Sequence, residues 1–314
     1  MKILLTGTTG QVGHALRHAL QGLGDIIIPA REQMDLGNPD ALRQTILEIS
    51  PDLIINPAAY TAVDKAESEP ELAHRINAIA PGIMAEEAKK LGAALIHYST
   101  DYVFDGTKRD VTGNLLAYDE QDTPCPINVY GKTKLEGEQA IRDSGCRHLI
   151  FRTSWVYSTF GKNFLLTMLR LAKERDELKV VNDQWGAPTS AEWIAKSTAN
   201  IVGQLQSSTS AQDWWEKNSG LYNMTPAGIT SWCGFTGEIV GVAKVLALFD
   251  KPTPKVTEIS TKEYPVQATR PVNSLLSSNL LFTHFGIQVP VWQAPVLDCL
   301  RAISTNQQSG NHTN

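Results

Sequence analysis

The sequence predicts an α/β protein, with a Rossmann-like, doubly wound parallel sheet followed by a smaller mixed α/β substrate-binding region. Short apolar runs alternate with helical patterns over the first 160 residues, which favours parallel strands joined by right-handed helical crossovers. A glycine-rich turn directly follows the first apolar run. The chain has 314 residues, of which 42% are hydrophobic and 19% charged, so a large buried core can form.

The first element is a buried strand over residues 2–6, which runs into the glycine-rich turn and then a helical pattern. This order is the context of a dinucleotide-binding fingerprint. Gly7 permits the tight turn, Gly10 lets a pyrophosphate approach the backbone, and Gly13 lets the helix pack closely on the strand. The open N–H groups at the helix start then face the anion. A tight turn without a ligand is the alternative.

The second strand, residues 25–30, ends where a dinucleotide fold receives the adenosine ribose. An acidic residue there would bond the ribose 2′-OH, but this chain has Arg31 followed by Glu32. Arg31 can pair with a 2′-phosphate, so NADPH is preferred over NADH as the predicted cofactor, unless Arg31 is a solvated loop residue. Asp35 and Leu36 come next and are expected to border the adenine.

The pattern continues through three further strands. They are expected at residues 53–56, 93–98 and 148–153, separated by helical patterns over 38–49 and 70–91 and around residue 130. Small residues, Pro57 to Thr61, follow the third strand, and Ser99-Thr100 end the fourth. Ligands sit at the carboxyl ends of parallel strands. Thr100 is therefore a candidate site residue, with a satisfied strand-end hydroxyl as the alternative.

Tyr130 and Lys134 are four residues apart, so a helix places both on one face. A phenol with a pKa of about 10 is a poor proton donor at neutral pH, and a neighbouring ammonium is expected to lower that pKa. The pair therefore suits acid/base catalysis. The same spacing also arises by chance, as a packed tyrosine beside a solvated lysine. The glycine turn and Thr100 favour the catalytic interpretation.

The second half of the chain is less regular. Helices are expected over residues 163–172, from Ser190 and over 232–248, with a short strand at 180–181. Arg270 precedes a proline and either meets a phosphate or lies solvated at the surface. The expected division is a dinucleotide-binding domain over 1–160 that holds the catalytic residues, a substrate-binding region over 161–303 with segments that can return to the sheet, and a polar, disordered tail over 304–314.

Charge and cysteine usage exclude several classes of protein. The net charge is −5 and no Lys/Arg-rich block occurs, which argues against nucleic acid as a partner. No apolar run reaches membrane-spanning length, and the first residues do not form a secretory signal. The four cysteines are scattered, without a CxxC pair. Reduced thiols in a cytoplasmic protein are expected, rather than a disulfide framework or a zinc site.

Three motifs together resemble the extended short-chain dehydrogenase/reductase family: Gly7-x-x-Gly10-x-x-Gly13, Ser99-Thr100 and Tyr130-x-x-x-Lys134. Within it, further blocks resemble the reductases that act on dTDP-4-dehydrorhamnose. These blocks follow family order to about residue 280 and are Gly10–Gly13, Ala62–Glu67, Ser99–Gly106, Val129–Lys134, Arg152–Tyr157, Asn182–Thr189 and Arg270–Ser274. The resemblance implies reduction of the C4 ketone of a dTDP-linked 4-keto-6-deoxy sugar, dTDP-4-dehydro-L-rhamnose, by NADPH or NADH. The product, dTDP-L-rhamnose, is a precursor of cell-surface polysaccharide.

The resemblance also implies a role for each site residue. Tyr130 gives a proton to the carbonyl oxygen, Thr100 donates a hydrogen bond to it, and Lys134 tunes Tyr130 and holds the nicotinamide ribose. The implied cofactor contacts are Gly7, Gly10, Gln11, Val12, Gly13, Asp35, Leu36, Ala59, Tyr60, Thr61, Tyr98, Tyr130 and Lys134. The implied substrate contacts are Thr100, Asp101, Trp155, Gln184 and Arg270, with Trp155 as a wall of the sugar pocket.

Several alternatives stay open within this resemblance. Related 4,6-dehydratases usually have Asp-Glu after the strand-end Thr, whereas Thr100 is followed here by Asp101-Tyr102, which favours simple reduction. An epimerase or another 4-keto-sugar reductase would use much the same Tyr and Lys. A regulatory subunit that binds a dinucleotide without catalysis is less favoured, because the Thr/Tyr/Lys set is intact.

A metal ligand set is not predicted. Some relatives have a Glu two residues after the third glycine and use it in a magnesium site between subunits. This chain has His14-Ala15 in that region, and Glu192 alone is a poor magnesium site. Magnesium is therefore doubtful, and association into a homodimer stays an open expectation.

Overall fold

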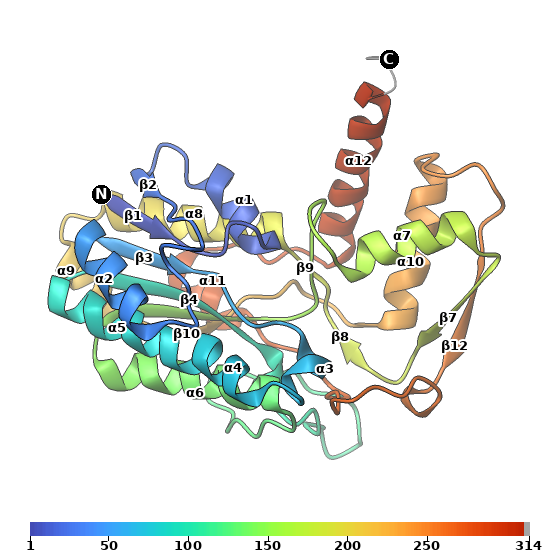
Figure 1. Ribbon diagram of the computed structural model, residues 1–314. Coiled ribbons are helices and arrows are strands. Elements are labelled where there is room, and N and C mark those ends of the chain that lie inside the picture. The colour runs from blue at the N-terminus through green and yellow to red at the C-terminus, as the bar shows by residue number, and fades with distance from the viewer. Residues whose placement is uncertain (311–314) are drawn as a thin grey trace.

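The computed structural model describes residues 1–310 and contains a large parallel sheet with helices on both faces, beside a smaller α/β region (Figure 1). The sheet has the strand order β10-β5-β4-β3-β1-β2, and every neighbouring pair is parallel. The strands are β1 (Lys2–Leu5), β2 (Asp25–Ile27), β3 (Leu53–Asn56), β4 (Ala94–Thr100), β5 (Arg147–Thr153) and β10 (Gly220–Asn223). The predicted doubly wound fold is confirmed.

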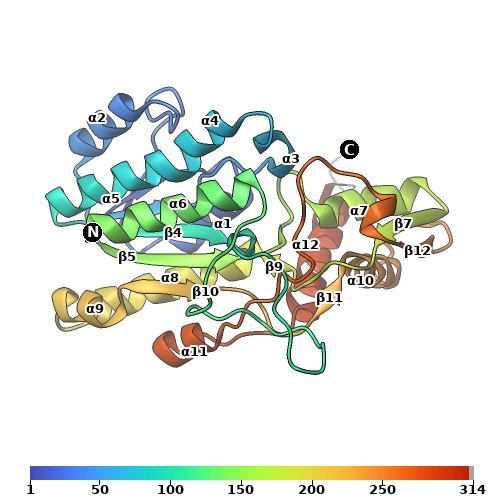
Figure 2. The same cartoon turned by 90° about the horizontal axis from the view of Figure 1, so that it is seen from below.

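Two sets of helices cover the two faces of the sheet (Figure 2). The first set is α1 (Gln11–Ala19), α8 (Ala191–Ser207), α9 (Ala211–Asn218) and α11 (Asn279–Phe285), and the second is α2 (Pro39–Ile49), α5 (Ala80–Leu91) and α6 (Val129–Ser144). Ile3 and Leu5 pack toward the first set and Leu4 toward the second, as the alternation of side chains along a strand requires. Burial on both faces explains why the strands are apolar almost throughout.

The strand order reverses between β1 and β3, which are neighbours although β2 lies between them in sequence. In open α/β sheets, ligands bind outside the carboxyl ends of the strands at such a switch point. The glycine turn follows β1 and the segment Pro57–Thr61 follows β3. Both segments therefore border the crevice at the switch point.

The smaller region has its own apolar core, which includes Leu169, Phe235 and Leu300. It consists of α7 (Phe164–Glu174), α10 (Trp232–Val245), α12 (Gln293–Gly310) and the parallel strands β7 (Glu177–Val181) and β12 (Lys255–Ile259). Two short strand pairs lie between this region and the sheet, namely β6 (Val156–Tyr157) with β9 (Thr189–Ser190), and β8 (Trp185–Gly186) with β11 (Thr230–Ser231). The chain returns to the large sheet through α8, α9, β10 and α11.

The predicted disordered tail is wrong for residues 304–310, because these residues continue helix α12. Val296 and Leu300 anchor this helix in the core of the smaller region, and each further turn then adds backbone hydrogen bonds without a new nucleation cost. Residues 311–314 of the predicted tail lie outside the described residues. Among residues 1–310, none of the helices combines the length and apolar character needed to cross a bilayer.

The predicted helix over residues 70–91 is divided into three consecutive pieces. They are α4 (Pro70–His74), a π-helical turn (Arg75–Ile79) and α5. Pro81 has no N–H to bond the carbonyl four residues earlier, and the helix accommodates this proline by widening into the π turn. The remaining short helices are α3 (Val63–Ala66) and the 3₁₀ turns Asp101–Val103 and Thr261–Glu263.

Candidate active site

The glycine turn after β1 depends on close backbone packing. Gly7 has a φ of +60°, and a Cβ there would lie 2.8 Å from the backbone nitrogen of Ala58. A Cβ on Gly13 would lie 2.1 Å from the carbonyl oxygen of Gly7. No side-chain cap covers the start of α1 at Gly10, which is exposed. The first-turn N–H groups can therefore bind an anion, and the turn fits the pyrophosphate of a dinucleotide.

Both polar atoms of the Gln11 side chain form hydrogen bonds with other residues of the protein. Its Nε2 donates to the carbonyl oxygen of Val156 at 3.2 Å. Its Oε1 accepts from Ser158 Oγ at 3.1 Å and from Asn163 Nδ2 at 2.9 Å. Val12 packs against the core of the first face. The predicted cofactor contacts of Gln11 and Val12 are therefore limited to their backbone groups.

The predicted adenosine contacts lie in the turn after β2. Arg31 and Asp35 are exposed, whereas Leu36 is half-buried and packs against the core of the second face. One oxygen of the Asp35 carboxylate accepts the N–H of Gly37 at 2.9 Å. Arg31 can therefore reach a ligand from solvent, at the edge of the sheet next to β1.

The segment after β3 is held by Asn77, a residue that the sequence did not single out. Asn77 Oδ1 accepts the N–H of Tyr60 at 2.8 Å, and Asn77 Nδ2 donates to the carbonyl oxygen of Tyr60 at 3.1 Å. The amide thus binds both backbone groups of Tyr60 and fixes the strip Ala59–Thr61 at the crevice. Asn77 lies in the π turn that accommodates Pro81. This proline was the feature of the sequence from which a special role of Asn77 could have been inferred.

Thr100 and Tyr130 meet at the carboxyl end of β4. Thr100 is the last residue of that strand, and Tyr130 is in the first turn of α6, which is capped by Asn128. A Cβ on Gly131 would lie only 2.0 Å from the carbonyl oxygen of Tyr102. This glycine therefore lets the helix start approach the 3₁₀ turn after β4 closely, where the Tyr130 ring packs edge-on against Tyr102 with centroids 5.5 Å apart and the Thr100 hydroxyl lies near enough to influence the phenol. The sequence did not assign a role to Gly131.

The pKa of Tyr130 is raised to about 12, mainly because the phenol is removed from water. The Thr100 hydrogen bond lowers it, and the charge of Asp101 raises it further. The prediction that Lys134 lowers the Tyr130 pKa is therefore wrong for this structure. Burial outweighs the influence of a neighbouring cation, and Lys134 directs its ammonium elsewhere.

Lys134 is almost completely buried, with 1% of its surface exposed. Its Nζ donates to the carbonyl oxygen of Tyr98 at 2.6 Å and lies 3.0 Å from Nε2 of His97. Burial lowers the pKa of Lys134 to about 8, against the opposing charge of Glu138 one turn further along α6. His97 was not predicted, because a single histidine in a buried strand is commonly a core residue.

Tyr98 contributes to the site through its backbone. Its ring is buried in the core of the first face. Its hydroxyl lies 2.7 Å from Thr198 Oγ1 on α8. Because side chains alternate along β4, the Tyr98 side chain points away from the crevice, so the predicted cofactor contact of Tyr98 would have to come from its backbone. What remains at the site is the carbonyl that binds Lys134.

Asp101 is buried directly beside Thr100. Thr100 Oγ1 donates to Asp101 Oδ1 at 3.1 Å, whereas Asp101 Oδ2 has no hydrogen-bond partner among the described residues. Burial raises the pKa of this carboxyl to about 7, while the nearby hydroxyls of Ser274 and Thr100 act in the opposite direction. Asp101 therefore changes charge near neutral pH and offers one free oxygen to a polar ligand.

An aromatic wall stands beyond the end of β5. Trp155 has a φ of +48°, and its ring stacks on Trp232 with centroids 3.6 Å apart. Trp232 Nε1 donates to Gln184 Oε1 at 3.2 Å. A Cβ on Gly186 would lie 2.7 Å from the Trp155 ring. The structure brings the predicted Trp155 and Gln184 together and adds Trp232, which lies too far along the chain to be linked to them from sequence.

Arg270 connects the loop that contains it to Asp64, which follows strand β3 of the large sheet. Its Nη2 forms an ion pair with Asp64 Oδ2 at 2.6 Å, and its guanidinium lies over the ring of Tyr102 at 6.0 Å. The backbone on either side is also held, because the Ala268 N–H donates to Asp64 and Asn128 Nδ2 donates to the Thr269 carbonyl. Arg270 Nη1 is buried and without a partner among the described residues, which leaves one donor for a ligand.

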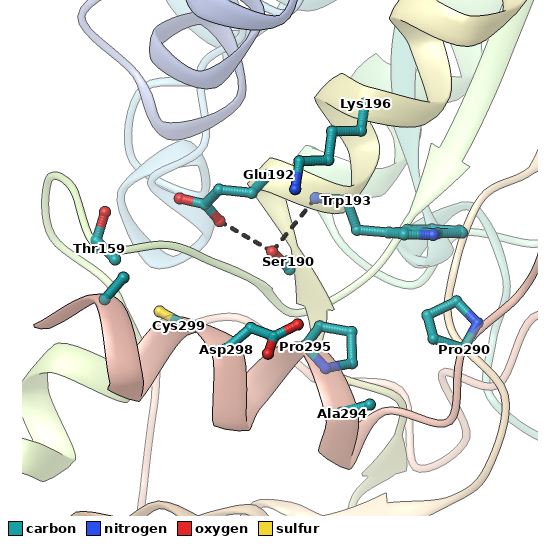
Figure 3. A pocket seen from close by; sticks show the side chains of 11 residues that line it. Thr159, Ser190, Glu192, Trp193, Lys196, Pro290, Ala294, Pro295, Asp298 and Cys299 are labelled. Atoms are coloured by element: carbon teal, nitrogen blue, oxygen red, sulfur yellow. Dashed lines mark hydrogen bonds between the residues drawn. The ribbon is translucent and has the colours of Figure 1, made fainter. Parts of the chain in front are cut away.

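A cavity of about 380 Å³ lies between α8 and α12, away from Thr100 and Tyr130 (Figure 3). Glu192 and Asp298 face it, and Ser190 Oγ donates to Glu192 Oε2 at 2.9 Å. Within residues 1–310, no group of three or more His, Cys, Asp or Glu side chains is arranged to hold a metal ion. Hard divalent cations prefer several oxygen ligands, so these two carboxylates alone do not fit a magnesium ion.

The chain is similar over nearly its full length to known proteins. A family model described as the RmlD substrate binding domain matches residues 1–305. The chain is 45% identical over 302 residues to a dTDP-4-dehydrorhamnose reductase of Burkholderia thailandensis, covering 96% of this chain and 98% of that relative. It is 42% identical over 309 residues to a dTDP-4-dehydrorhamnose reductase of Escherichia coli K12, covering 97% and 99% of the two chains.

Solved structures agree with this similarity. A dTDP-4-dehydrorhamnose reductase from Bacillus anthracis in complex with NADP is 33% identical, with a TM-score of 0.84 and coverage of 96% of this chain and 99% of that chain. One from Clostridium acetobutylicum is 36% identical, with a TM-score of 0.85 and the same coverage. A UDP-glucose 4-epimerase from Thermus thermophilus in complex with NAD, at 16% identity, a TM-score of 0.75 and coverage of 96% and 98%, shares the fold alone.

Proposed function

The chain belongs to the family described as the RmlD substrate binding domain, and from this premise we propose that it reduces dTDP-4-dehydro-L-rhamnose to dTDP-L-rhamnose with NADPH or NADH. The relatives named above are reductases of this sugar nucleotide. The observation that carries the proposal is the placement of Thr100, at the carboxyl end of β4, beside Tyr130 in the first turn of α6. A hydroxyl and a phenol close together on the same edge of the sheet as a dinucleotide-binding turn suit reduction of a carbonyl group.

The cofactor is expected along the edge formed by the ends of β1, β2 and β3. The N–H groups at the start of α1 would bind the pyrophosphate, and the backbone of Ala59–Thr61 would border the nicotinamide half. Arg31 would pair with a 2′-phosphate, which favours NADPH, and the Bacillus anthracis relative contains NADP. When bound, the nicotinamide supplies the hydride for the carbonyl carbon.

Tyr130 and Thr100 act on the carbonyl oxygen. Negative charge grows on this oxygen during reduction, and the Tyr130 phenol transfers its proton to it. Thr100 donates a hydrogen bond to the same oxygen and stabilises the developing charge. A Tyr130 pKa of about 12 keeps the phenol protonated at neutral pH, so the residue starts the reaction as an acid. Lys134 lies one turn further along α6, and its nitrogen would hold the nicotinamide ribose.

The sugar is expected between Thr100 and the aromatic wall. The stacked rings of Trp155 and Trp232 form an apolar surface, which suits the face of a deoxy sugar and its methyl group. The free oxygen of Asp101 and the free Nη1 of Arg270 offer one acceptor and one donor for the hydroxyl and phosphate groups. These contacts would present C4 to Tyr130.

The direct test is turnover of the proposed substrate. The protein would be incubated with NADPH, dTDP-4-dehydro-6-deoxyglucose and a 3,5-epimerase that generates the 4-keto-L-rhamnose in place. We expect NADPH oxidation with dTDP-L-rhamnose as the product. Tight NADPH binding without oxidation would instead support a regulatory subunit. An epimerised sugar nucleotide formed without net oxidation of NADPH would support an epimerase.

A cytoplasmic location and a homodimer belong to the same proposal. Cys125, Cys146, Cys233 and Cys299 are all free thiols, which is the state that a reducing compartment maintains. Sedimentation equilibrium would measure the oligomeric state, and we expect a dimer whose mass is unchanged by EDTA.

A further inference from the structure

A buried chain of polar side chains runs across the large sheet and ends at Lys134. Thr6 Oγ1 lies 2.6 Å from Asn56 Oδ1, Asn56 Nδ2 lies 3.2 Å from His97 Nδ1, and His97 Nε2 lies 3.0 Å from Lys134 Nζ. These residues come from the ends of β1 and β3, from β4 and from α6. Asn56 and His97 are completely buried, and Thr6 is 7% exposed. None of the three has a role in the mechanism described above.

The charge on Lys134 determines which atoms of Thr6, Asn56 and His97 donate hydrogen bonds and which accept them. An ammonium has three donors and no acceptor. A charged Lys134 therefore requires an unprotonated His97 Nε2, with the ring proton on Nδ1 and the Asn56 oxygen turned toward the ring. The arrangement in the structure, with Asn56 Nδ2 facing His97 Nδ1 and Asn56 Oδ1 facing Thr6, matches a proton on Nε2 and an uncharged Lys134 amine.

Rotation of the Asn56 amide by 180° interconverts these two arrangements, because amide nitrogen and oxygen occupy nearly the same positions. The Thr6 hydroxyl can donate or accept, so it satisfies either orientation. In both states every member of the chain keeps its partner. The two states differ by one proton on Lys134, whereas His97 stays neutral in both.

We propose that His97 is a positioning residue for Lys134, and that Thr6, Asn56 and His97 form a two-state hydrogen-bonded unit that holds the lysine nitrogen in place whether or not it is charged. An apolar neighbour would satisfy only the uncharged amine, and a carboxylate would satisfy only the ammonium. A neutral imidazole backed by an amide accommodates both. The inference rests on the proposed function, in which Lys134 holds the nicotinamide ribose.

The other groups around Lys134 are consistent with this assignment. Tyr98 contributes only a carbonyl oxygen, which accepts in either state. The charge of Glu138 favours the ammonium of Lys134, but the Glu138 carboxylate is bound by Arg152 at 2.6 and 2.9 Å and by Ser99 at 2.5 Å. Burial and the charge of Lys134 both hold the pKa of His97 well below its usual value, so the imidazole stays neutral over the working range.

The test compares His97→Leu with His97→Gln. The main readout is the dissociation constant of NADPH between pH 6 and pH 10, measured by quenching of tryptophan fluorescence, with kcat followed over the same range. Leucine removes the acceptor from the ammonium, so we expect the alkaline loss of NADPH affinity and of kcat to move down by about one pH unit. Glutamine retains an acceptor and should leave this transition close to that of the unchanged protein.

The outcomes separate positioning from a purely structural role. If His97→Leu leaves the transition unchanged, or if both variants lose affinity only in proportion to their loss of thermal stability, the inference is rejected. Should His97→Leu fail to fold, Asn56→Leu removes the group that accepts the Nδ1 proton of His97 when Lys134 is charged, so the transition should shift in the same direction. If the pH transition is unchanged in that variant, the proposed hydrogen-bonded unit is rejected. Because NADPH binding needs no turnover, failure of the ketone reduction alone would reject the proposed function and leave this inference supported.

Discussion

Gly131→Ala provides a sharp test of how the catalytic residues are brought together. The added Cβ would lie 2.0 Å from the Tyr102 carbonyl oxygen, whereas ordinary contact begins at 3.4 Å. The obstacle is backbone, which cannot rotate away as a flexible side chain would. The start of α6 must therefore move away from the 3₁₀ turn by about 1.4 Å, and Tyr130 moves with it.

A displacement of this size acts mainly on catalysis. Misplacing a reacting group by about 1 Å can reduce the rate by about 100-fold, and forcing one extra methyl group into a packed contact costs about 1–3 kcal/mol of stability. We expect kcat for NADPH oxidation to fall by about 100-fold in Gly131→Ala. The NADPH dissociation constant should change much less than kcat, because most of the expected cofactor contacts lie on the glycine turn, on α1 and after β3 rather than on α6.

Gly237→Ala is the matched control. Gly237 is also inside a helix, α10, but a Cβ there would meet nothing within 4 Å. That variant should gain about 0.5–1 kcal/mol of stability from the higher helix propensity of alanine, with unchanged kcat. The reasoning would be refuted if Gly131→Ala kept more than half of the original kcat while remaining folded by circular dichroism, because the Thr100 contact would then not depend on this close approach.

Four further predictions follow from the site and its surroundings. Tyr130→Phe should lower kcat by about 10²- to 10⁴-fold with nearly unchanged NADPH binding, and surviving turnover would mean that another group donates the proton. Arg31→Ala should weaken NADPH by about tenfold and NADH by much less; equal weakening of both in a binding titration would contradict the 2′-phosphate contact. Arg152→Met leaves a buried carboxylate unpaired and should cost about 3–5 kcal/mol in urea unfolding. Arg170→Met, which removes a surface pair with 60% and 51% exposed side chains, should cost less than about 0.5 kcal/mol, and similar losses in the two variants would show that burial is not decisive. Burial raises the Asp101 pKa to about 7, so this carboxyl contributes stability at low pH that is lost as the pH rises through 7. Asp101→Asn should therefore be more stable than the unchanged protein at pH 8 but not at pH 4, and parallel unfolding curves at both values would exclude the raised pKa.

The large sheet was predictable because its strands are continuous apolar runs between helical patterns. The runs at residues 53–56 and 93–98 correspond to β3 and β4 within about two residues. The strand β10 was not predicted, since Gly220–Asn223 is short and carries glycine and asparagine. Its place in the sheet comes from pairing with β5, a contact between residues about 70 positions apart, which local patterns do not encode.

The site was predictable where one motif fixes the local geometry. The glycine turn and the Tyr130/Lys134 spacing each specify a backbone arrangement within a few residues. The partners of these motifs were not predictable, because His97, Asn77 and Trp232 reach the site through packing between distant segments. The raised pKa of Tyr130 was not predicted for the same reason: spacing reveals a nearby lysine, but not how far partial burial disfavours the phenolate.

The return of the chain to the large sheet has a consequence for synthesis of the protein on the ribosome. One face of that sheet is covered by α8, α9 and α11, whose residues Ile201, Trp215 and Phe285 lie in the same core as Leu5 and Leu16. A nascent chain that has emerged only to residue 160 therefore exposes this face to solvent. The amino-terminal half must wait, or be shielded by a chaperone, until residues near 285 have left the exit tunnel. Folding of the catalytic half is thus completed late in translation, although nearly all of its sequence is made first.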